Sequence, residues 1–468
     1  MKKLSELYQV DSDIMIKGIK MNSKEIEEGD LFVATQGVVA DRHDFIDDAI
    51  KNGASAVVVS KDIGNKNVPI IKVENTNKEL SKICAKFYDY PEKDLFIIGV
   101  TGTNGKTTVA KMLYDMIGEK AAYLGTLGAI WNDKRENLVN TTPDSDKLFK
   151  YFRKFVDDGC TILIMETASE AFFRKRLEGI DFDVSIMTNI TGDHLNIHKT
   201  MDNYISCKSE LFQKTKKDGI CILNVDDNYY QRIENASNGK IITYGKQESD
   251  IKIDSVKLDG ERIRLEAIIN GKLEEFNIPL PGEYNAYNFA SCIPVLLNLG
   301  YSLEDIKQRT DNIKTIEGRG EFIEQGQNFK IVLDYAHTPE ALKNILTYLN
   351  RIKKNRIITV TGSAGGREHE KRPAMGKIVL DMSDYVIFTM DDPRHEDPNE
   401  IIDDLLKESN KTNYERIVDR KEAIYKAFDI AQKDDIVLVA GKARDNYMAI
   451  EDKYLPYNDY DVIINYFN

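Results

Sequence analysis

The feature that most constrains the fold of this chain is an apolar run that passes directly into a glycine-rich turn. Ile97–Val100 is long enough for the end of a strand, and it leads into Thr101–Thr108, with the sequence TGTNGKTT. The helical pattern VAKMLYDMI follows at once. In such a strand–turn–helix unit, backbone N–H groups, the helix N-terminus and the lysine face a bound phosphate. The unit therefore predicts an α/β fold with a phosphate site in this turn.

The turn departs from the common spacing G-x-x-x-x-G-K-[ST], because Val100 stands where the first glycine would be. The shorter G-T-N-G-K-T-T is a narrower signal for nucleotide binding, and the alternative is a glycine-rich turn with an incidental lysine. We predict that the turn binds ATP and that Thr107 places its hydroxyl on Mg²⁺. The ATP-binding residues predicted in the turn are Gly102, Thr103, Asn104, Gly105, Lys106, Thr107 and Thr108.

Strands and helices alternate along most of the chain. Thr161–Met165, Val184–Thr188 and Cys221–Val225 have the composition of buried strands, and their alternation with helices is typical of a doubly wound parallel sheet. Residues 250–280 alternate with period two, which predicts an antiparallel hairpin attached to that sheet. After Gly318–Gly320 the rhythm restarts with KIVLDYAH, RIITVTGS, YVIFTM and DIVLVAG, which indicates a Rossmann-like unit.

The first 90 residues carry a separate pattern of short elements. Apolar runs at Leu31–Ala34 and Ala56–Val59 flank a helical pattern at Phe45–Lys51, as in a small α/β unit. A chain of 468 residues is long enough for about three domains. We therefore predict an α/β protein with a small N-terminal domain, a central doubly wound domain that carries the phosphate turn, and a C-terminal Rossmann-like domain. Their predicted bounds are residues 1–93, 94–315 and 316–468.

Composition excludes several classes of protein. Lys and Arg total 64 against 77 Asp and Glu, so the net charge of −13 argues against a nucleic-acid scaffold held by phosphate contacts. No apolar run approaches the ~18 residues of a membrane span, and MKKLSELYQV lacks the apolar core of a secretory signal. Five scattered cysteines without CxxC spacing argue against structural zinc and a disulfide framework. We expect a cytoplasmic monomer that binds no nucleic acid and does not insert into membranes.

Five further segments extend the pattern beyond the phosphate turn. NSKEIEEGDLFVATQG lies near the N-terminus, and NTTPD spans Asn140–Asp144. The others are Thr188–Tyr204, Asp334–Leu342 and Gly366–Gly376. Together with the turn they resemble the Mur ligase family, ATP-dependent enzymes that join an amino acid to a carboxylate. The resemblance covers essentially the whole chain and is strongest to the branch that adds the third peptide residue in peptidoglycan synthesis.

The resemblance implies a reaction and its substrates. The chain would use ATP to activate the carboxylate of UDP-N-acetylmuramoyl-L-Ala-D-Glu as an acyl phosphate, join it to a free diamino acid, and release ADP and phosphate. The implied cofactors are two Mg²⁺ ions and a carbamate formed from CO₂ on Lys208. The three domains would bind the uridine nucleotide, ATP and the amino acid in turn. Because activation brings two anions together, charge neutralisation and positioning would carry catalysis.

The resemblance also assigns catalytic and metal-binding residues. Glu166 ends a buried strand and would face the phosphates, with a solvated loop acid as the alternative. His194 would bind the second metal ion rather than being an ordinary loop or core histidine, and His198 would orient its neighbours. A carbamate would turn the Lys208 cation into an anion that holds Mg²⁺, against the alternative of a solvated helix lysine. The implied catalytic residues are Lys106, Glu166, His194 and Lys208, and the implied metal ligands are Thr107, Glu166, His194 and Lys208 as carbamate.

The substrate-binding residues follow from the matching motifs. By resemblance, Asn285 contacts the adenine ring. The third domain would bring Arg319, Asp334 and His337 to ATP when it closes. Arg176 would pair with a substrate anion, although an exposed helix arginine is the alternative. The implied residues for the uridine nucleotide are Ser23, Asn140, Thr141, Thr142, Ser169 and Arg176. Those for the incoming amino acid are Arg367, Asp391, Asp392, Pro393, Arg394, Gly441 and Asp445.

The amino-acid motifs depart from those of the diaminopimelate-adding enzymes. Their Asp-Asn-Pro-Arg has Asp392 as its second residue here, and their Gly-Lys-Gly-His-Glu is GKARD at Gly441–Asp445. Arg394 and Arg367 would read a distal carboxylate through the planar guanidinium fork, which favours meso-diaminopimelate. Asp392 opposes this assignment because like charges repel. L-lysine, L-ornithine and lanthionine are therefore alternatives.

Three other interpretations stay open. The folylpolyglutamate synthetase branch has a related nucleotide turn, although it lacks a uridine-binding domain and the NTTPD motif. A paralogue that adds another amino acid outside the main wall pathway would account for the altered METASEA and GKARDN segments. A non-catalytic nucleotide-binding switch is the third, and the intact Lys106, Glu166 and Lys208 argue against it.

Overall fold

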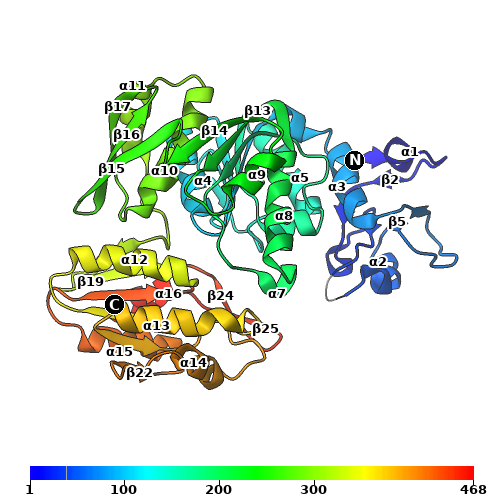
Figure 1. Ribbon diagram of the computed structural model, residues 1–468. Coiled ribbons are helices and arrows are strands. Elements are labelled where there is room, and N and C mark those ends of the chain that lie inside the picture. Colours follow the sequence, from blue (N-terminus) through cyan, green and yellow to red (C-terminus); the bar gives the residue numbers. More distant parts are fainter. Residues whose placement is uncertain (38–39) are drawn as a thin grey trace.

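The computed structural model describes residues 1–37 and 40–468, which form successive α/β units along the chain (Figure 1). The elements of the N-terminal unit are β1 (Lys2–Lys3), α1 (Leu4–Leu7), β2 (Met15–Ile16), β3 (Ile19–Lys20), β4 (Leu31–Val33), α2 (Ile46–Lys51), β5 (Ala56–Val59), β6 (Ile70–Lys72) and α3 (Thr76–Phe87). Its parallel sheet has the order β3-β4-β5-β6. Side chains alternate across this sheet, so Phe32 and Val57 pack with α2 whereas Val33 and Val58 pack with α3.

The central unit contains the phosphate turn. Its strands are β7 (Phe96–Thr101), β8 (Ala121–Gly125), β9 (Gly128–Trp131), β10 (Lys134–Glu136), β11 (Ile162–Glu166), β12 (Phe182–Met187), β13 (Thr215–Asn224), β14 (Lys240–Gly245), β15 (Ile251–Asp259), β16 (Arg262–Ile269) and β17 (Lys272–Ile278). Its helices are α4 (Lys106–Ile117), α5 (Ser145–Asp157), α6 (Ser169–Phe173), α7 (Leu195–His198), α8 (Met201–Gln213), α9 (Tyr230–Ala236), α10 (Tyr284–Asn298) and α11 (Leu303–Arg309). The strand order is β10-β9-β8-β11-β7-β12-β13-β14-β15-β16-β17.

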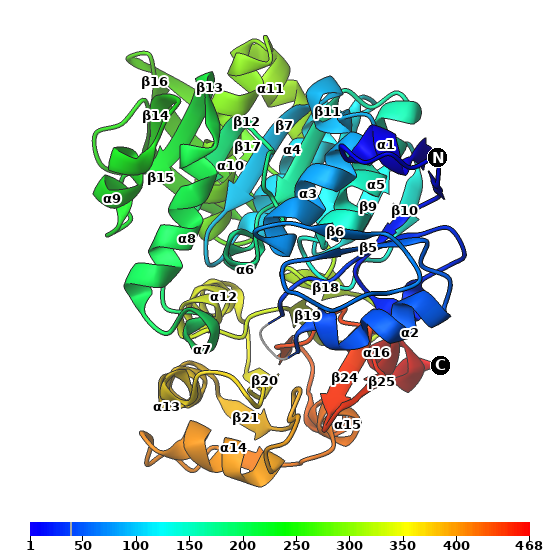
Figure 2. The same cartoon turned by 90° about the vertical axis from the view of Figure 1, so that its right-hand side faces the viewer.

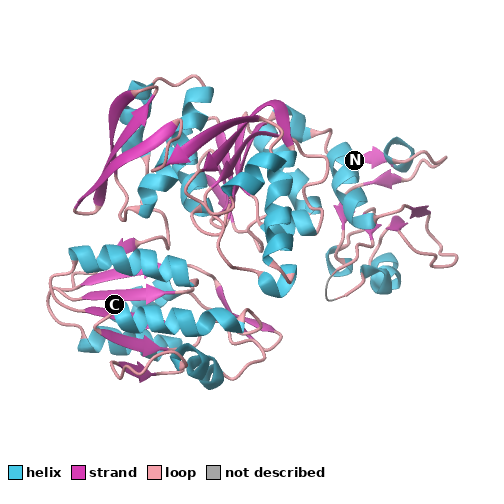
Figure 3. Cartoon of the chain, in the orientation of Figure 1, coloured by secondary structure: helices cyan, strands magenta, loops and turns pink. Residues whose placement is uncertain are grey.

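The position of β7 in this order creates a binding edge. β7 pairs in parallel with β11 on one side and with β12 on the other. The strands that follow β7 along the chain therefore lie on both sides of it. At such a switch point the carboxyl ends of neighbouring strands open onto one crevice. Helices α4 and α10 lie on one face of the sheet and α5 and α8 on the other (Figure 3). Their apolar residues pack against the two faces of the sheet. The doubly wound sheet predicted from the sequence is therefore present.

The antiparallel extension is larger than the predicted hairpin. β15, β16 and β17 form a meander, and β15 joins the main sheet by pairing in parallel with β14. The second turn of the meander is Asn270-Gly271, where both residues have positive φ (51° and 74°). An Asn-Gly pair with this backbone is a strong hairpin signal, which the sequence analysis did not use.

The C-terminal unit is a second α/β layer structure that lies below the central unit in both Figure 1 and Figure 2. Its strands are β18 (Glu321–Ile323), β19 (Lys330–Asp334), β20 (Ile357–Thr361), β21 (Tyr385–Phe388), β22 (Tyr414–Arg416) and β23 (Ile436–Ala440), in the order β18-β19-β23-β20-β21-β22. Helices α12 (Pro339–Ile352), α13 (Arg372–Met382) and α14 (Pro398–Leu406) cover one face, and α15 (Arg420–Ile430) and α16 (Asp459–Phe467) cover the other. A short hairpin of β24 (Tyr447–Ile450) and β25 (Lys453–Pro456) precedes α16.

In the described ranges 1–37 and 40–468, no helix combines the length and the apolar character that crossing a membrane requires. All five cysteines are free and buried: Cys84, Cys160, Cys207, Cys221 and Cys292.

Candidate functional site

A cavity of about 1120 Å³ is lined by residues of both the central and the C-terminal units. Its walls include the turn after β7 and segments that follow β11, β12, β19 and β23. Both sheets therefore present the carboxyl ends of parallel strands to the same space. The predicted site residues that line it are Thr103, Asn104, Gly105, Lys106, Thr107, Thr108, Asn140, Thr141, Thr142, Glu166, Ser169, Arg176, His194, Lys208, Asn285, Arg319, Asp334, His337, Arg367, Asp391, Asp392, Gly441 and Asp445.

Two glycines give the phosphate turn its shape. Gly102 has φ +148°, and a Cβ there would lie 1.8 Å from Thr188 Oγ1. Gly105 has φ +86°, and a Cβ there would lie 2.5 Å from Asn288 Oδ1. Only glycine combines this backbone with so little space. The turn therefore packs tightly between the end of β12 and the start of α10.

Two lysines, the half-buried Lys106 and the buried Lys208, meet at one carbonyl of this turn. Lys106 Nζ donates to the carbonyl oxygens of Gly102 (2.9 Å) and Thr103 (3.0 Å), and Lys208 Nζ donates to Gly102 O at 2.7 Å. Lys208 reaches the turn because α8 packs directly on β7, where a Cβ at Gly99 would lie 2.6 Å from Leu211 Cδ1. The close packing of α8 on β7 thus brings Lys208 to the phosphate turn.

The surroundings of Lys208 suit the predicted carbamate. Its side chain is buried, so the alternative of a solvated helix lysine is wrong. Burial, and then the nearby Lys106 ammonium, hold the pKa of Lys208 well below its ordinary value. The neutral amine is the form that reacts with CO₂, and burial favours it.

Glu166 is fully buried at the end of β11 and is not a solvated loop acid. Its Oε2 accepts from Thr107 Oγ1 (2.9 Å) and Thr126 Oγ1 (3.1 Å), and its Oε1 accepts from Thr126 N (2.8 Å) and from the Tyr123 hydroxyl. These bonds hold the carboxylate beside the first turn of α4. The predicted pair of Thr107 and Glu166 is therefore in direct contact.

Residues of the C-terminal unit reach this pair. Arg319 Nη2 donates to Thr107 Oγ1 at 3.2 Å, and its guanidinium lies 4.6 Å from the centre of the Tyr335 ring. The Asp334 carboxylate accepts from the N–H groups of Gly320 (2.6 Å) and Ala336 (2.8 Å), which fixes the segment around Arg319. Burial raises the pKa of Asp334 to about 6, and Arg319 opposes the shift.

Two histidines line or support the same cavity. His194 has φ +56° at the start of α7, and its Nε2 lies 3.5 Å from Asp193 Oδ2. Burial lowers the pKa of His194 to about 4 although Asp193 opposes the shift, so the imidazole is neutral at pH 7. His337 is also neutral because burial lowers its pKa to about 4, and its Nδ1 lies 2.8 Å from Tyr335 O.

Several buried polar atoms of this cavity have no hydrogen-bond partner in the described part of the chain. They include Asn104 Nδ2, Thr191 Oγ1 and His194 Nδ1. Buried polar groups are normally satisfied, so orphaned atoms at a cavity wall point to a ligand. No group of three or more His, Cys, Asp and Glu side chains gathers as a metal site within residues 1–37 and 40–468. Mg²⁺ commonly binds through one or two protein oxygens together with phosphate and water, which fits Thr107 and Glu166.

The predicted uridine-nucleotide residues line the cavity, except for Ser23. Thr142 Oγ1 donates to Glu166 O (2.8 Å), and Arg176 Nη1 donates to Thr142 O (3.0 Å) while its Nε donates to Asp144. Arg176 is buried, so it is not an exposed helix arginine. Ser23 is buried in a 3₁₀ turn of the N-terminal unit and does not line the cavity in the described residues.

His198 and Asn285 both make polar contacts with neighbouring side chains. His198 Nε2 lies 2.9 Å from Ser169 Oγ, so it orients a predicted substrate residue. Asn285 lies in the first turn of α10, where its Nδ2 donates to Pro281 O (2.7 Å) and its Oδ1 accepts from Asn288 (2.8 Å). Asn288 also lines the cavity.

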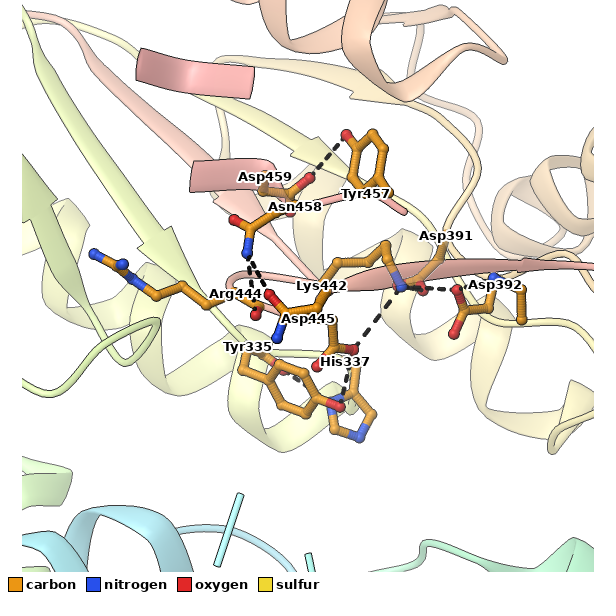
Figure 4. A network of polar contacts seen from close by, with 12 residues as sticks. Tyr335, His337, Asp391, Asp392, Lys442, Arg444, Asp445, Tyr457, Asn458 and Asp459 are labelled. Carbon is orange, nitrogen blue, oxygen red and sulfur yellow. Dashed lines mark hydrogen bonds and ion pairs between the residues drawn. The ribbon is translucent and has the colours of Figure 1, made fainter. Parts of the chain in front are cut away.

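The amino-acid motifs converge around one buried lysine (Figure 4). Lys442 Nζ lies 2.7 Å from Asp392, 3.8 Å from Asp391 and 3.9 Å from Asp445. Burial raises the pKa of Asp445 to about 6, and the Lys442 ammonium opposes this shift. The like-charge objection to Asp392 is weakened because Lys442 neutralises it.

Pro393 and Arg394 do not line the cavity in the described residues. Arg394 has φ +53°, and its backbone N–H and carbonyl form hydrogen bonds with Ala449 and Glu451. Arg367, in contrast, is half-buried and lines the cavity. The structure therefore brings Arg367 into the site with Asp391, Asp392 and Asp445, and leaves Arg394 beside it.

Sequence reasoning missed Thr126, Asp193 and Lys371, which line the cavity, and Tyr123, which contacts Glu166 without lining it. Thr126 and Tyr123 hold Glu166, and Asp193 and Lys371 form an ion pair of 3.6 Å between the units. Thr126 follows the carboxyl end of β8, a strand beside β11, which is a usable signal once strand order is known. The sequence does not give that order, because neighbouring strands are distant along the chain.

Three domains of known families together match most of the chain. The Mur ligase middle domain matches residues 100–296, the Mur ligase, glutamate ligase domain matches residues 318–443, and the Mur ligase family, catalytic domain matches residues 15–88.

Individual proteins agree with these matches. UDP-N-acetylmuramoyl-L-alanyl-D-glutamate–2,6-diaminopimelate ligase of Clostridium tetani is 38% identical over 99% of this chain and 97% of its own length. A solved ligase of the same name is 26% identical, with a TM-score of 0.68 over 100% of this chain and 98% of that one. A MurF ligase from Thermotoga maritima, solved in complex with ADP, shares the fold at 22% identity, with a TM-score of 0.67 over 92% of this chain and 95% of that one. The three-domain α/β layout predicted from the sequence is confirmed, and the chain belongs to the Mur ligase family.

Proposed function

We propose that this chain is an ATP-dependent ligase that joins UDP-N-acetylmuramoyl-L-Ala-D-Glu to a free diamino acid and releases ADP and phosphate. The observation that carries the proposal is the convergence of the phosphate turn, Arg319 and the acid cluster around Lys442 on one cavity. The name of the Clostridium tetani relative gives the same substrate pair. The ADP in the Thermotoga maritima relative supports ATP as the nucleotide.

The residues of the phosphate turn would neutralise the anions that must meet. Lys106 and the N-terminus of α4 face the phosphates, and Arg319 adds a cation from the C-terminal unit. Transfer of a phosphoryl group to the substrate carboxylate forms an acyl phosphate, which an amine then attacks. Cations held in place before the reaction stabilise the transferring group without reorganisation.

Thr107, Glu166, His194 and Lys208 as a carbamate are the residues that would hold two Mg²⁺ ions. Bound Mg²⁺ would supply charge neutralisation at the phosphate oxygens. The buried Glu166 carboxylate and the unpartnered His194 Nδ1 fit this role. The buried, electrically disfavoured ammonium of Lys208 fits carbamate formation.

The C-terminal unit would bind the incoming amino acid. Asp445 would accept a hydrogen bond from an ammonium and Arg367 would bind a carboxylate, and both residues line the cavity. Meso-diaminopimelate carries both groups at the distal end of its side chain, so we favour it over L-lysine, L-ornithine and lanthionine. Lys442 supports this choice because it offsets the charge of Asp392.

The other predicted residues would bind the two nucleotides. Ser23, Asn140–Thr142, Ser169 and Arg176 would bind the uridine nucleotide, and Asn285, Asp334 and His337 would bind ATP. The domain boundaries would fall at residues 93/94 and 315/316. The protein would act as a monomer in the cytoplasm, the compartment that supplies ATP.

The test is ATP-dependent phosphate release with UDP-N-acetylmuramoyl-L-Ala-D-Glu and each of the four amino acids in turn. We expect release that requires both the uridine nucleotide and an amino acid, with meso-diaminopimelate giving the highest kcat/KM. A preference for L-lysine would overturn the choice of amino acid. No release with any of the four would overturn the substrate assignment.

A further inference from the structure

The β24–β25 hairpin carries two large aromatic side chains that are exposed and line the cavity. Tyr447 is 37% exposed and Tyr454 is 72% exposed. Their ring centres are 5.0 Å apart, with the rings at 82° to each other. In the hairpin register Tyr454 lies opposite Ala449, two residues from Tyr447, so both rings are on one face of the hairpin. Leu455, next to Tyr454, points to the other face.

The hairpin is attached directly to the loop that carries the amino-acid motif. Asp392 Oδ1 accepts from Ala449 N at 2.9 Å, and Arg394 N donates to Ala449 O at 3.0 Å. Arg394 O in turn accepts from Glu451 N at 2.7 Å. These bonds explain the left-handed backbone of Arg394, which turns the loop so that it pairs with β24. The two tyrosines are therefore held at a fixed position relative to Asp391 and Asp392.

Tyr447 lies over the charged cluster. Lys442 Nζ is 5.4 Å from the centre of its ring, and burial followed by Asp445 and Asp392 raises the pKa of Tyr447. The cluster beneath has three carboxylates and one ammonium among Asp391, Asp392, Asp445 and Lys442, so it carries an excess of negative charge. Aromatic faces attract cations, and an acidic pocket behind them strengthens that attraction.

We propose that Tyr447 and Tyr454 form the outer wall of the amino-acid subsite and select the incoming amino acid by contact with its ammonium-bearing chain. This inference rests on the proposed ligase function and adds two specificity-determining residues to it. An amino acid with a second ammonium at the end of a long side chain reaches the tyrosine pair, whereas a short one does not.

The test compares two neighbouring residues of β25 in the full-length protein. Tyr454→Ala removes a ring from the cavity face, and Leu455→Ala removes a side chain that is 44% exposed from the opposite face. We expect Tyr454→Ala to raise the KM for the preferred diamino acid about fivefold while kcat and the KM values for ATP and the uridine nucleotide stay near wild type. Leu455→Ala should leave all four quantities near wild type.

The outcomes separate this inference from the function on which it rests. Wild-type protein without amino-acid-dependent phosphate release would remove the ligase function, and the inference with it. An active wild type with an unchanged KM in Tyr454→Ala would overturn the inference alone. Equal losses in Tyr454→Ala and Leu455→Ala, accompanied by a lower Tm, would also overturn it, because the hairpin would then act only as a structural support.

Discussion

Single residues at this site act through buried hydrogen bonds that fix charges before any substrate arrives. Glu166 is the clearest case, because Thr107, Thr126 and Tyr123 all donate to its carboxylate. Sequence reasoning identified Glu166 and Thr107 from their places after a strand and after a glycine turn. It could not identify Tyr123 and Thr126, since a donor's partner depends on strand order rather than on local sequence.

Tyr123→Phe tests this support. The substitution removes one donor from Glu166 and leaves the ring in place, so we expect kcat/KM to fall about fivefold with the fold retained. Tyr114→Phe is the matched control, because Tyr114 packs edge-on against Tyr123 in the same layer. Steady-state kinetics on both variants decide the matter. Equal activity in Tyr123→Phe and wild type would mean that this bond does not position Glu166.

Asp146→Asn tests the stability effect of a buried acid outside the cavity. Burial, and then Asp144, raise the pKa of Asp146 to about 6, above the value near 4 of an unfolded chain. The folded state then binds the proton more tightly, so this group's contribution is fully present below pH ~4 and is lost as pH rises through ~6. We expect Asp146→Asn to be more stable than wild type by about 1–3 kcal/mol at pH 8 and to match it near pH 4.

Urea unfolding of wild type, Asp146→Asn and Asp157→Asn at pH 4, 6 and 8 measures this difference. Asp157 lies on the same helix, α5, but is exposed, so its variant should show no such trend. A difference between wild type and Asp146→Asn that does not change with pH would contradict the assigned pKa shift.

Lys208 gives a chemical prediction at the same scale. Intact-protein mass measured at mildly basic pH with bicarbonate should include a species heavier by one CO₂, and Lys208→Arg should lack it. We also expect Lys208→Ala to lose about a hundredfold or more in kcat, because the substitution removes the group that we propose holds Mg²⁺. Lys214→Arg, at the end of the same helix, is the control. A mass adduct that persists in Lys208→Arg would place the modification elsewhere.

At the scale of elements, the strand–turn–helix unit was the most predictable part of the chain. Its glycine spacing and periodicity encode a local structure, and β7 and α4 flank the turn as expected. The meander was predicted less completely, because the alternation of residues 250–280 was interpreted as one hairpin and the Asn270-Gly271 turn was not used. The attachment of β24 to the amino-acid loop could not be predicted, since it depends on the left-handed backbone of Arg394.

Gly102→Ala tests the shape of the turn against glycine loss in general. A Cβ at Gly102 would overlap Thr188 Oγ1, so the turn must move, and we expect the Kd for ATP to rise about tenfold or more. Gly118 also has positive φ, but nothing lies within 4 Å of a Cβ there. Gly118→Ala should therefore cost about 1–2 kcal/mol of stability and leave ATP binding unchanged. Calorimetric titration with ATP measures the Kd of both variants. A wild-type Kd in Gly102→Ala would show that the glycine does not determine the shape of the ATP site.

At the scale of the whole molecule, the site exists only because two sheets meet. Arg319 donates to Thr107 across the units, Lys371 pairs with Asp193, and Asn196 N donates to Glu368 at 3.3 Å. The sequence indicated which segments carry function, because motifs mark the ends of strands in both units. The pairing of the units could not be read from it, since no local pattern records which strand ends face each other.

The most direct test of the central claim is mass spectrometry of the uridine nucleotide after incubation with ATP, Mg²⁺ and meso-diaminopimelate. The account predicts a product heavier than the substrate by one diaminopimelate less one water, formed in equal amount with ADP and phosphate. ADP formation without that product, or product formation without ATP, would contradict it.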